Sequence, residues 1–174
     1  MASCALTQGF TLSGCKDGVG GLLAAYFIER GNVTSYVKAS GQITALVKTT
    51  GKQFYKYELQ RNTAEWKEDI EGNPDNGTVT FKQSLDIVLN RLQTSVRNEI
   101  LLLAKNNLWV IVADRNGNYW LLGEQLGVDL TKAVAGAGKA GGDRSGFPLT
   151  FTGEEPEMAS SVSATVAAAL TTPG

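Results

Sequence analysis

Residues 78–124 constrain the fold of this chain most, because their hydrophobic pattern changes period twice. Between residues 79 and 89, apolar and polar side chains alternate, and only Gln83 interrupts the apolar series. A period of two is typical of a strand with one buried face. At roughly 3.3 Å per residue the predicted strand measures about 36 Å, which is long for a globular domain. Its apolar positions are Val79, Phe81, Leu85, Ile87 and Leu89.

After this strand the pattern becomes helical. Apolar residues recur at spacings of four, four and three, which is the period of one helix face. Asn90 and Gln93 have the spacing of an N-terminal capping box. We therefore expect one helix over residues 91–105, and Leu101 and Leu102 widen its apolar stripe, so the helix should be well covered. The stripe consists of Leu92, Val96, Ile100 and Leu103.

A tight hairpin follows the predicted helix. Residues 108–113 are a nearly unbroken apolar run with branched and aromatic members, which indicates a buried strand. Asn116-Gly117 favours the left-handed dihedral angles of a two-residue type I′ turn. Residues 119–122 then complete the hairpin.

Further extended segments flank this central unit. Residues 22–29, 33–38 and 41–48 are predicted strands, and residues 146–153 are the last one. The resulting fold class is mainly β with one α-helix. We expect an antiparallel β-sandwich or barrel that is flanked by the helix.

Residues 51–77 are predicted to form an extended hairpin. Residues 53–61 and 63–70 each alternate, and one face of the pair is charged. The dense turn residues of 71–77 then lead into the long strand. Residues 1–153 are expected to form a single domain.

Two segments contain little that could build a core. Residues 132–144 are mostly Ala and Gly, which predicts a mobile or partner-ordered loop. Residues 154–174 are acidic and then rich in Ser, Ala, Thr and Val, and we expect a flexible C-terminal tail.

Composition argues against most catalytic chemistry. The 174 residues include 16 basic and 17 acidic side chains and no His, so the commonest general base and metal ligand is missing. The carboxylate cluster of Glu65, Asp69 and Glu71 is best interpreted as a solvated face. Residues 114–118 have only a faint similarity to a calcium loop. We predict that the chain is not an enzyme and binds no cofactor and no metal.

The N-terminal region offers no targeting or redox signal. Residues 22–28 are too short to span a bilayer, which needs about 20 apolar residues, so we expect a soluble protein with no membrane contact. Glycines before residue 22 lack the Gly-Lys-Ser/Thr ending of a phosphate loop. Cys4 and Cys15 could pair, although two free thiols in a reducing compartment fit better.

The predicted strands are longer than one compact core requires. Long edge strands are an aggregation hazard unless they are paired, and identical neighbours in a closed ring can pair them. We therefore expect homo-oligomeric self-assembly.

The order of these elements resembles the tail tube proteins of tailed bacteriophages. The similarity covers roughly residues 20–155. Four short runs also resemble virion proteins of phages that infect Bacteroidota-type bacteria. They are NGTV (76–79), SVRNEI (95–100), YWLLG (119–123) and GDRSG (142–146).

This resemblance implies stacked, hexameric rings in which four strands of each subunit build a continuous barrel around the genome. The barrel would include residues 78–89 with either 108–122 or 41–48, and residues 51–77 would reach the next ring. Partners would be copies of the chain, other tail proteins such as the tape measure, terminator or sheath, and DNA passing without sequence-specific contacts. Localisation would be the virion tail, after assembly in the host cytoplasm. Inter-subunit contacts are expected at Phe54, Tyr55, Tyr57, Trp66, Asp143 and Arg144.

Two alternatives remain open at this stage. One is another virion protein of the neck, terminator or decoration class. The other is a non-viral β-sandwich module that binds a peptide or sugar through its loops.

Overall fold

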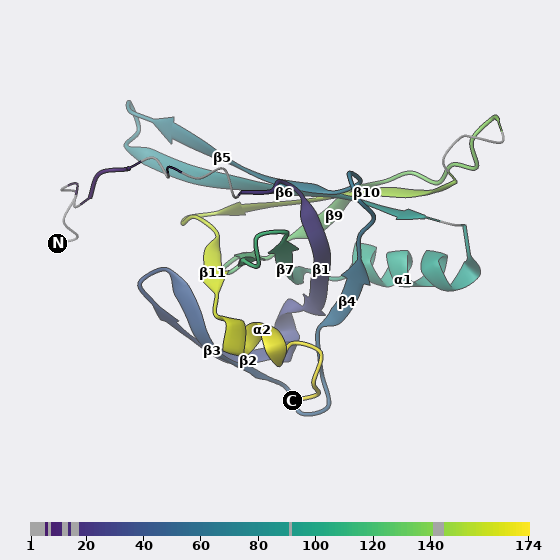
Figure 1. Cartoon of the computed structure of the whole chain (residues 1–174), viewed down its shortest axis with the longest axis horizontal. Helices are drawn as coiled ribbons and strands as arrows, with labels where there is room; N and C mark the ends of the chain where they lie inside the picture. The colour runs from purple at the N-terminus through teal and green to yellow at the C-terminus, as the bar shows by residue number, and fades with distance from the viewer. Residues whose placement is uncertain (1–5, 7, 12–13, 15–17, 91, 141–144) are drawn as a thin grey trace.

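The computed structural model describes the whole chain except residues 1–5, 7, 12–13, 15–17, 91 and 141–144. Two stacked sheets and a flanking helix form the molecule (Figure 1), which confirms the predicted fold class. The seven-stranded sheet has the order β2 (Val33–Ala39), β3 (Gln42–Lys48), β11 (Ser160–Val162), β8 (Tyr119–Leu122), β7 (Leu108–Asp114), β1 (Leu22–Glu29) and β4 (Tyr55–Glu58). The four-stranded sheet has the order β5 (Glu65–Asn73), β6 (Thr78–Asn90), β10 (Gly146–Glu155) and β9 (Asp129–Ala133). The helices are α1 (Thr94–Lys105), α2 (Ala164–Ala168) and the short 3₁₀ segment η1 (Arg30–Asn32).

Two apolar cores stabilise the sandwich. The larger core lies between the sheets and includes Phe27, Leu85, Val110 and Phe151. The second core covers the opposite face of the seven-stranded sheet, where β3, α2 and the segments around them pack on Ile111. Because both faces of β7 are covered, its residues from Leu108 to Ala113 are all buried.

The central unit has the predicted order of β6, α1, β7 and β8, but the predicted capping box is wrong. Asn90 is the last residue of β6 and pairs with Gly146 of β10, so its backbone belongs to the sheet. The helix begins at Thr94, and Gln93 occupies the N-cap without a side-chain cap bond.

The turn of the β7–β8 hairpin differs from the predicted type I′ turn. Asp114 N–H donates to the Asn118 carbonyl at 2.9 Å, which closes a three-residue loop. Within the described residues, Gly117 has positive φ (84°) in this turn and Asn116 does not. The Asp114 carboxylate accepts the N–H groups of Asn116 and Asn118, each at 2.8 Å, and thereby selects this conformation.

The predicted hairpin over residues 51–77 is wrong. β4 pairs with β1, where Tyr57 lies opposite Ala25, whereas β5 pairs with β6 in the other sheet. The prediction failed because alternation identifies a strand but not its partner. Asn62, which has a positive φ of 58°, lies on the segment that connects β4 in one sheet to β5 in the other. The long hairpin of this protein is β5–β6, which projects beyond the sandwich (Figure 1).

The expected flexible tail is also wrong. β11 lies between β3 and β8, and Ser163 caps α2 by accepting the Val166 N–H. Lys48 donates to the carbonyls of Ala169 (2.8 Å) and Leu170 (3.2 Å). The sequence-based prediction failed because the segment has few apolar residues, although three of them enter the second core: Val162, Val166 and Leu170.

Candidate functional site

The four-stranded sheet ends in two edge strands, β5 and β9. α1 packs beside β9, and Val128, directly before β9, exchanges backbone hydrogen bonds with Leu108, so β5 is the more open edge. Among the named strands of the described chain, β5 pairs only with β6 and β9 pairs only with β10. β5 is nine residues long, so one side of it presents a long row of unpaired backbone groups. Such edges can accept the strand of another chain.

The face of this sheet that points away from the sandwich is polar. The register places Glu65, Asp86 and Thr150 in one row, and Glu71 and Thr80 in another. Carboxylates outnumber lysines on this face, and Lys67 and Lys82 form ion pairs within it. Lys67 binds Glu65 at 2.9 Å, and Lys82 lies 2.8 Å from Glu71 and 3.9 Å from Glu154.

Gln83 connects the two sheets through the buried face of β6. Its amide oxygen accepts the Gly123 N–H at 2.9 Å, and its amide nitrogen donates to Glu68 at 2.9 Å. Gly123 has a positive φ of 75°, and a Cβ there would approach the Gly127 backbone to 2.7 Å. The polar residue that interrupts the apolar series therefore anchors a tight loop.

Two buried glutamates are structural in this geometry. Glu155 accepts the backbone N–H groups of Gln125, Leu126 and Gly127 at 2.9, 2.8 and 3.2 Å. Glu124 accepts hydrogen bonds from Ser160 and from Lys38 (3.1 Å).

Lys38 bridges Glu124 and Glu157. Burial alone would lower the pKa of Lys38, but its hydrogen bonds to Glu157 and Glu124 raise it above the ordinary value. These contacts fasten the loop after β8 to β2 and to the C-terminal segment.

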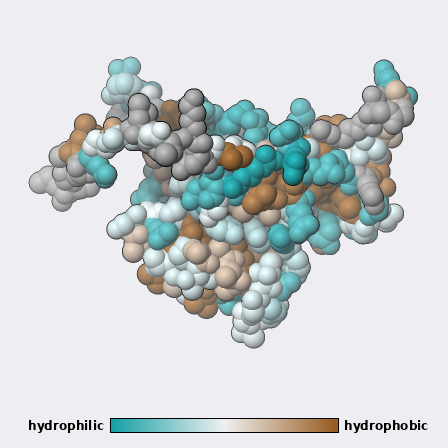
Figure 2. Space-filling view, in the orientation of Figure 1, coloured by the Kyte–Doolittle hydropathy of each residue, from teal (hydrophilic) through white to brown (hydrophobic). Residues whose placement is uncertain are grey.

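The β5–β6 hairpin carries exposed apolar residues. Ile70 is 57% exposed and Val79 is 52% exposed. They lie on the same face of the hairpin as the buried residues of β6, but the register places them between those residues and the turn of the hairpin. The hairpin tip itself is hydrophilic, as Figure 2 shows at the upper left.

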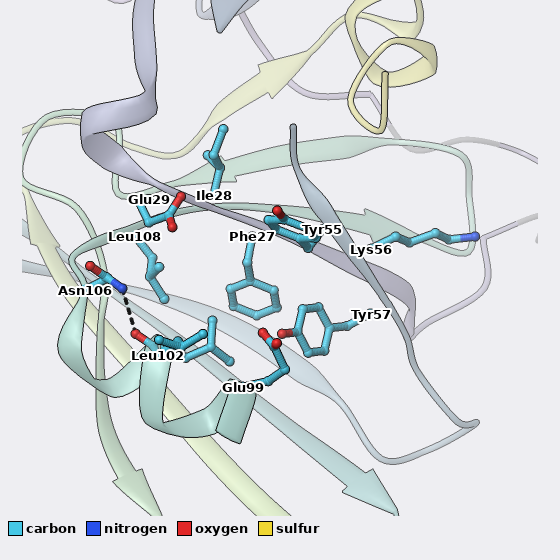
Figure 3. Close-up of a pocket in the computed structure, with 11 residues that line it drawn as sticks. Phe27, Ile28, Glu29, Tyr55, Lys56, Tyr57, Glu99, Leu102, Asn106 and Leu108 are labelled. Atoms are coloured by element: carbon cyan, nitrogen blue, oxygen red, sulfur yellow. Dashed lines mark hydrogen bonds between the residues drawn. The ribbon is translucent and has the colours of Figure 1, made fainter. Parts of the chain in front are cut away.

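A cleft of about 420 Å³ separates β4 from α1 (Figure 3). Phe27, Tyr57 and Leu102 line it, and the rings of Phe27 and Tyr57 meet edge to face at 4.9 Å. Burial, with a smaller contribution from Glu99, raises the pKa of Tyr57 to about 12. β4 is the edge strand of the seven-stranded sheet, so the cleft adjoins an edge of that sheet.

The prediction that α1 is well covered is wrong. Ile100 and Leu103 are buried, but Leu101 is 43% exposed and Leu102 is 55% exposed. The helix packs against the sandwich on one side only. Three residues of the predicted apolar stripe, Val96, Ile100 and Leu103, pack on the larger core. Leu92 lies before the helix and is 42% exposed, so its place in the stripe was predicted wrongly. The two additional leucines lie outside the packed face.

A second cleft, of about 690 Å³, lies between the η1–β2 region and the loop after β8. Tyr36, Trp109 and Glu124 are among its lining residues. The Trp109 ring lies edge to face with Tyr36 at 5.2 Å. In the described part of the chain, the buried Trp109 Nε1 has no hydrogen-bond acceptor, which costs free energy unless a bound group accepts it.

The predicted inter-subunit residues have different environments. Phe54 is fully buried in the second core, so its predicted contact with another subunit is wrong. Tyr55 is exposed, and both Tyr55 and Tyr57 border the β4–α1 cleft. Trp66 is half-buried against Trp120, with ring centroids 5.9 Å apart. Asp143 and Arg144, like Cys4 and Cys15, lie outside the described residues.

The exposed apolar surface of α1 was not predicted. Leu101 and Leu102 carried a usable signal, since they add apolar residues beyond the stripe that one packed face requires. Ile70 and Val79 carried no sequence signal of their exposure, because they alternate with polar neighbours in the same way as buried strand residues do.

The described residues contain no group of three or more His, Cys, Asp or Glu residues that could hold a metal ion. No helix in that part of the chain is long and apolar enough to cross a membrane.

In comparisons with known proteins, no family model, curated protein or solved structure matches this chain.

Proposed function

We propose that the chain is a structural subunit of a phage tail tube, which assembles into stacked hexameric rings, as its resemblance to tail tube proteins implies. The observation that carries this proposal is the four-stranded sheet, whose outer strands β5 and β9 each pair with one neighbouring strand only. A strand of one copy can pair with the opposite edge of the next copy, and repetition of this contact closes a ring. The proposed barrel therefore uses β5, β6, β10 and β9.

The polar face of this sheet supports a role as a conduit. In a closed ring one face of the sheet must line the lumen, and the other face packs on the seven-stranded sheet. The lumen face would carry Glu65, Glu71 and Glu154 with fewer lysines. Like charges repel the phosphates of DNA, so the genome would slide without sequence-specific binding.

The proposed partners and location follow from this role. The chain would bind copies of itself and other tail proteins such as the tape measure, terminator or sheath. It would act without catalysis or cofactor, in the tail of the virion. The proposed arm that reaches the neighbouring ring is the β5–β6 hairpin in place of residues 51–77.

Assembly and edge pairing can be tested together. Negative-stain microscopy of concentrated protein should reveal rings or hollow fibres. Hydrogen exchange should slow at the outward amides of β5 and β9 on assembly, whereas amides of the buried strand β7 serve as an internal control. A monomer at every concentration, or rings that leave β5 and β9 exchange unchanged, would contradict the proposal.

The second cleft favours another candidate function, a binding module for a hydroxyl-rich ligand such as a sugar. A hydroxyl can accept from the Trp109 N–H and donate to a carboxylate such as Glu124. Titration with neutral monosaccharides should then shift the indole N–H resonance of Trp109 but not that of Trp66. An unchanged Trp109 resonance would exclude this candidate.

A further inference from the structure

The chain contains two Asn-Gly pairs, Asn76-Gly77 and Asn116-Gly117, and both lie in exposed turns that join neighbouring strands. In such a pair the glycine nitrogen can reach the side-chain carbonyl carbon of the asparagine, because glycine has no Cβ to obstruct the approach. Both glycines have positive φ, 63° at Gly77 and 84° at Gly117, and a Cβ at either would meet nothing within 4 Å. The two pairs therefore differ mainly in their hydrogen bonds.

The turn after β7 holds Asn116 in place. The side-chain oxygen of Asn116 accepts the Val19 N–H at 2.8 Å, so the carboxamide has a fixed orientation. The Gly117 N–H, whose nitrogen is the potential nucleophile, donates to the Asp114 carbonyl at 3.4 Å. The Asp114 carboxylate also accepts the Asn116 N–H at 2.8 Å. This turn must therefore open before Asn116 and Gly117 can react with each other.

The Asp114 carboxylate keeps this turn closed at neutral and alkaline pH. It accepts the Asn118 N–H at 2.8 Å and the Asn118 side-chain amide at 3.0 Å. Burial alone would raise the pKa of Asp114, but the hydrogen bonds from Asn118 and Asn116 lower it below the ordinary value. The carboxylate therefore stays ionised at the pH at which a backbone amide can lose its proton.

The turn of the β5–β6 hairpin lacks these restraints. Residues 71–80 are all exposed, and the tip projects away from the sandwich (Figure 1). The Asn73 side-chain oxygen accepts the N–H groups of Asp75 at 3.0 Å and of Asn76 at 3.3 Å, which orders the start of the turn. In the part of the chain that the structure describes, neither the Asn76 carboxamide nor the Gly77 N–H forms a hydrogen bond. Both reacting groups are therefore unrestrained.

We propose that Asn76 is a site of spontaneous deamidation in the folded protein and that Asn116 is protected from the same reaction. The Gly77 nitrogen loses its proton to hydroxide and forms a bond to the side-chain carbonyl carbon of Asn76. The bond from that carbon to the amide nitrogen breaks, and the amide group takes a proton from water and leaves as ammonia. Solvent water then opens the cyclic imide at either carbonyl. In the net reaction asparagine and water give aspartate or isoaspartate and ammonium, without oxidation or reduction.

This reaction alters the hairpin to which the proposed function assigns the contact between rings, although the inference does not depend on that function. The product carries a negative charge beside Asp75 at the tip. Isoaspartate also lengthens the backbone by a methylene group, close to the Asn73–Thr78 pair that closes the hairpin. The fraction of modified protein therefore increases with the age of the chain.

Peptide mapping by mass spectrometry tests the proposal on the full chain. The folded protein is incubated at mildly alkaline pH, sampled over time and digested at acidic pH, so that digestion adds no deamidation. We expect conversion at Asn76 to be about tenfold faster than at Asn116, because the Asn116 turn must first open. In protein unfolded by urea the two rates should agree within about twofold, since each asparagine is followed by glycine and neither turn persists.

Two variants assign the cause of the difference. Asn76→Gln should nearly abolish conversion at position 76, and circular dichroism should stay unchanged because this side chain is exposed. Asp114→Ala removes the carboxylate that holds the second turn, so the rate at Asn116 in the folded protein should rise toward that at Asn76. Equal rates at the two sites of the folded wild-type protein, or faster conversion at Asn116, would overturn the proposal. A difference of the same size in urea would also overturn it, because the cause would then be sequence and not structure.

Discussion

The two sheets of this protein differ in how many of their faces are buried. The seven-stranded sheet packs apolar residues on both sides, and its strand β7 is buried from Leu108 to Ala113. The four-stranded sheet packs only one side, and β6 alternates between buried and partly exposed residues from Gln83 to Ile87. The stability of the single chain therefore depends on the first sheet and on one face of the second. The polar face and the β5 edge of the second sheet carry little of the core, and the proposed assembly uses them.

The largest difference between the sheets should appear on removing one buried side chain. Ile111→Ala deletes a fully buried residue of β7 and should lower the free energy of unfolding by about 2–5 kcal/mol. Thr80→Ala on the polar face of β6 should change it by less than about 0.5 kcal/mol. Urea unfolding of both variants measures the contrast, and equal losses would contradict it.

Removing a buried side chain from the C-terminal segment should lower stability about as much as removing one from the seven-stranded sheet. Leu170 is buried in the second core, so Leu170→Ala should cost about 2–4 kcal/mol. Leu126→Ala is a matched control, because Leu126 is exposed, and it should cost about 0.5 kcal/mol or less. Similar midpoints of thermal unfolding for both variants would show that the segment contributes no stability.

Gln83 tests the connection between the sheets. Gln83→Ala leaves the Gly123 N–H and the Glu68 carboxylate without this partner, which should cost about 1–3 kcal/mol. Gln60→Ala, at an exposed glutamine, is the control. Hydrogen exchange at Gly123 should also accelerate in the Gln83 variant, and unchanged exchange would argue against the bridge.

The smallest expected effect concerns the pKa of Tyr57 in the β4–α1 cleft. Folding raises the pKa of Tyr57 from 10.0 to about 12, so the folded state holds this proton more tightly. The resulting stability is complete below pH 10 and is lost as the pH rises toward 12. Because the phenol is partly exposed and screened by solvent, the loss should be about 1 kcal/mol.

Tyr57→Phe provides the control for this titration. The difference in unfolding free energy between wild type and this variant should decrease between pH 10 and pH 12. A difference that stays constant over this window would contradict burial as the cause, since Tyr26 and Tyr36 titrate equally in both proteins.

Local pattern predicted the elements well where both period and length were clear. The strand over residues 78–89, the helix and the apolar run over 108–113 all appear with shifts at their ends. β9 was not predicted, because its residues Asp129–Ala133 alternate weakly and lie beside a Gly-rich segment. β11 and α2 were missed for a similar reason, since each is too short to show a period.

Pairing could not be predicted from the same patterns. β4 and β5 are neighbours in sequence and alternate alike, yet they lie in different sheets. Whether the neighbouring aromatic residues are buried or exposed depended on which sheet each strand joins. Phe54 became a core residue because the chain before β4 bonds to the C-terminal segment, where the Phe54 N–H donates to Leu170 at 3.0 Å.

The sequence alone determined that this chain is a mainly β protein with one amphipathic helix, because periods of 2 and 3.6 are local properties of adjacent residues. Only the tertiary structure decided which strands pair, which leucines of α1 stay exposed and which end of the sheet projects. Those features depend on contacts between residues far apart in the chain, and no local period encodes them. The edge strands of the four-stranded sheet, on which the proposed assembly depends, belong to this second group.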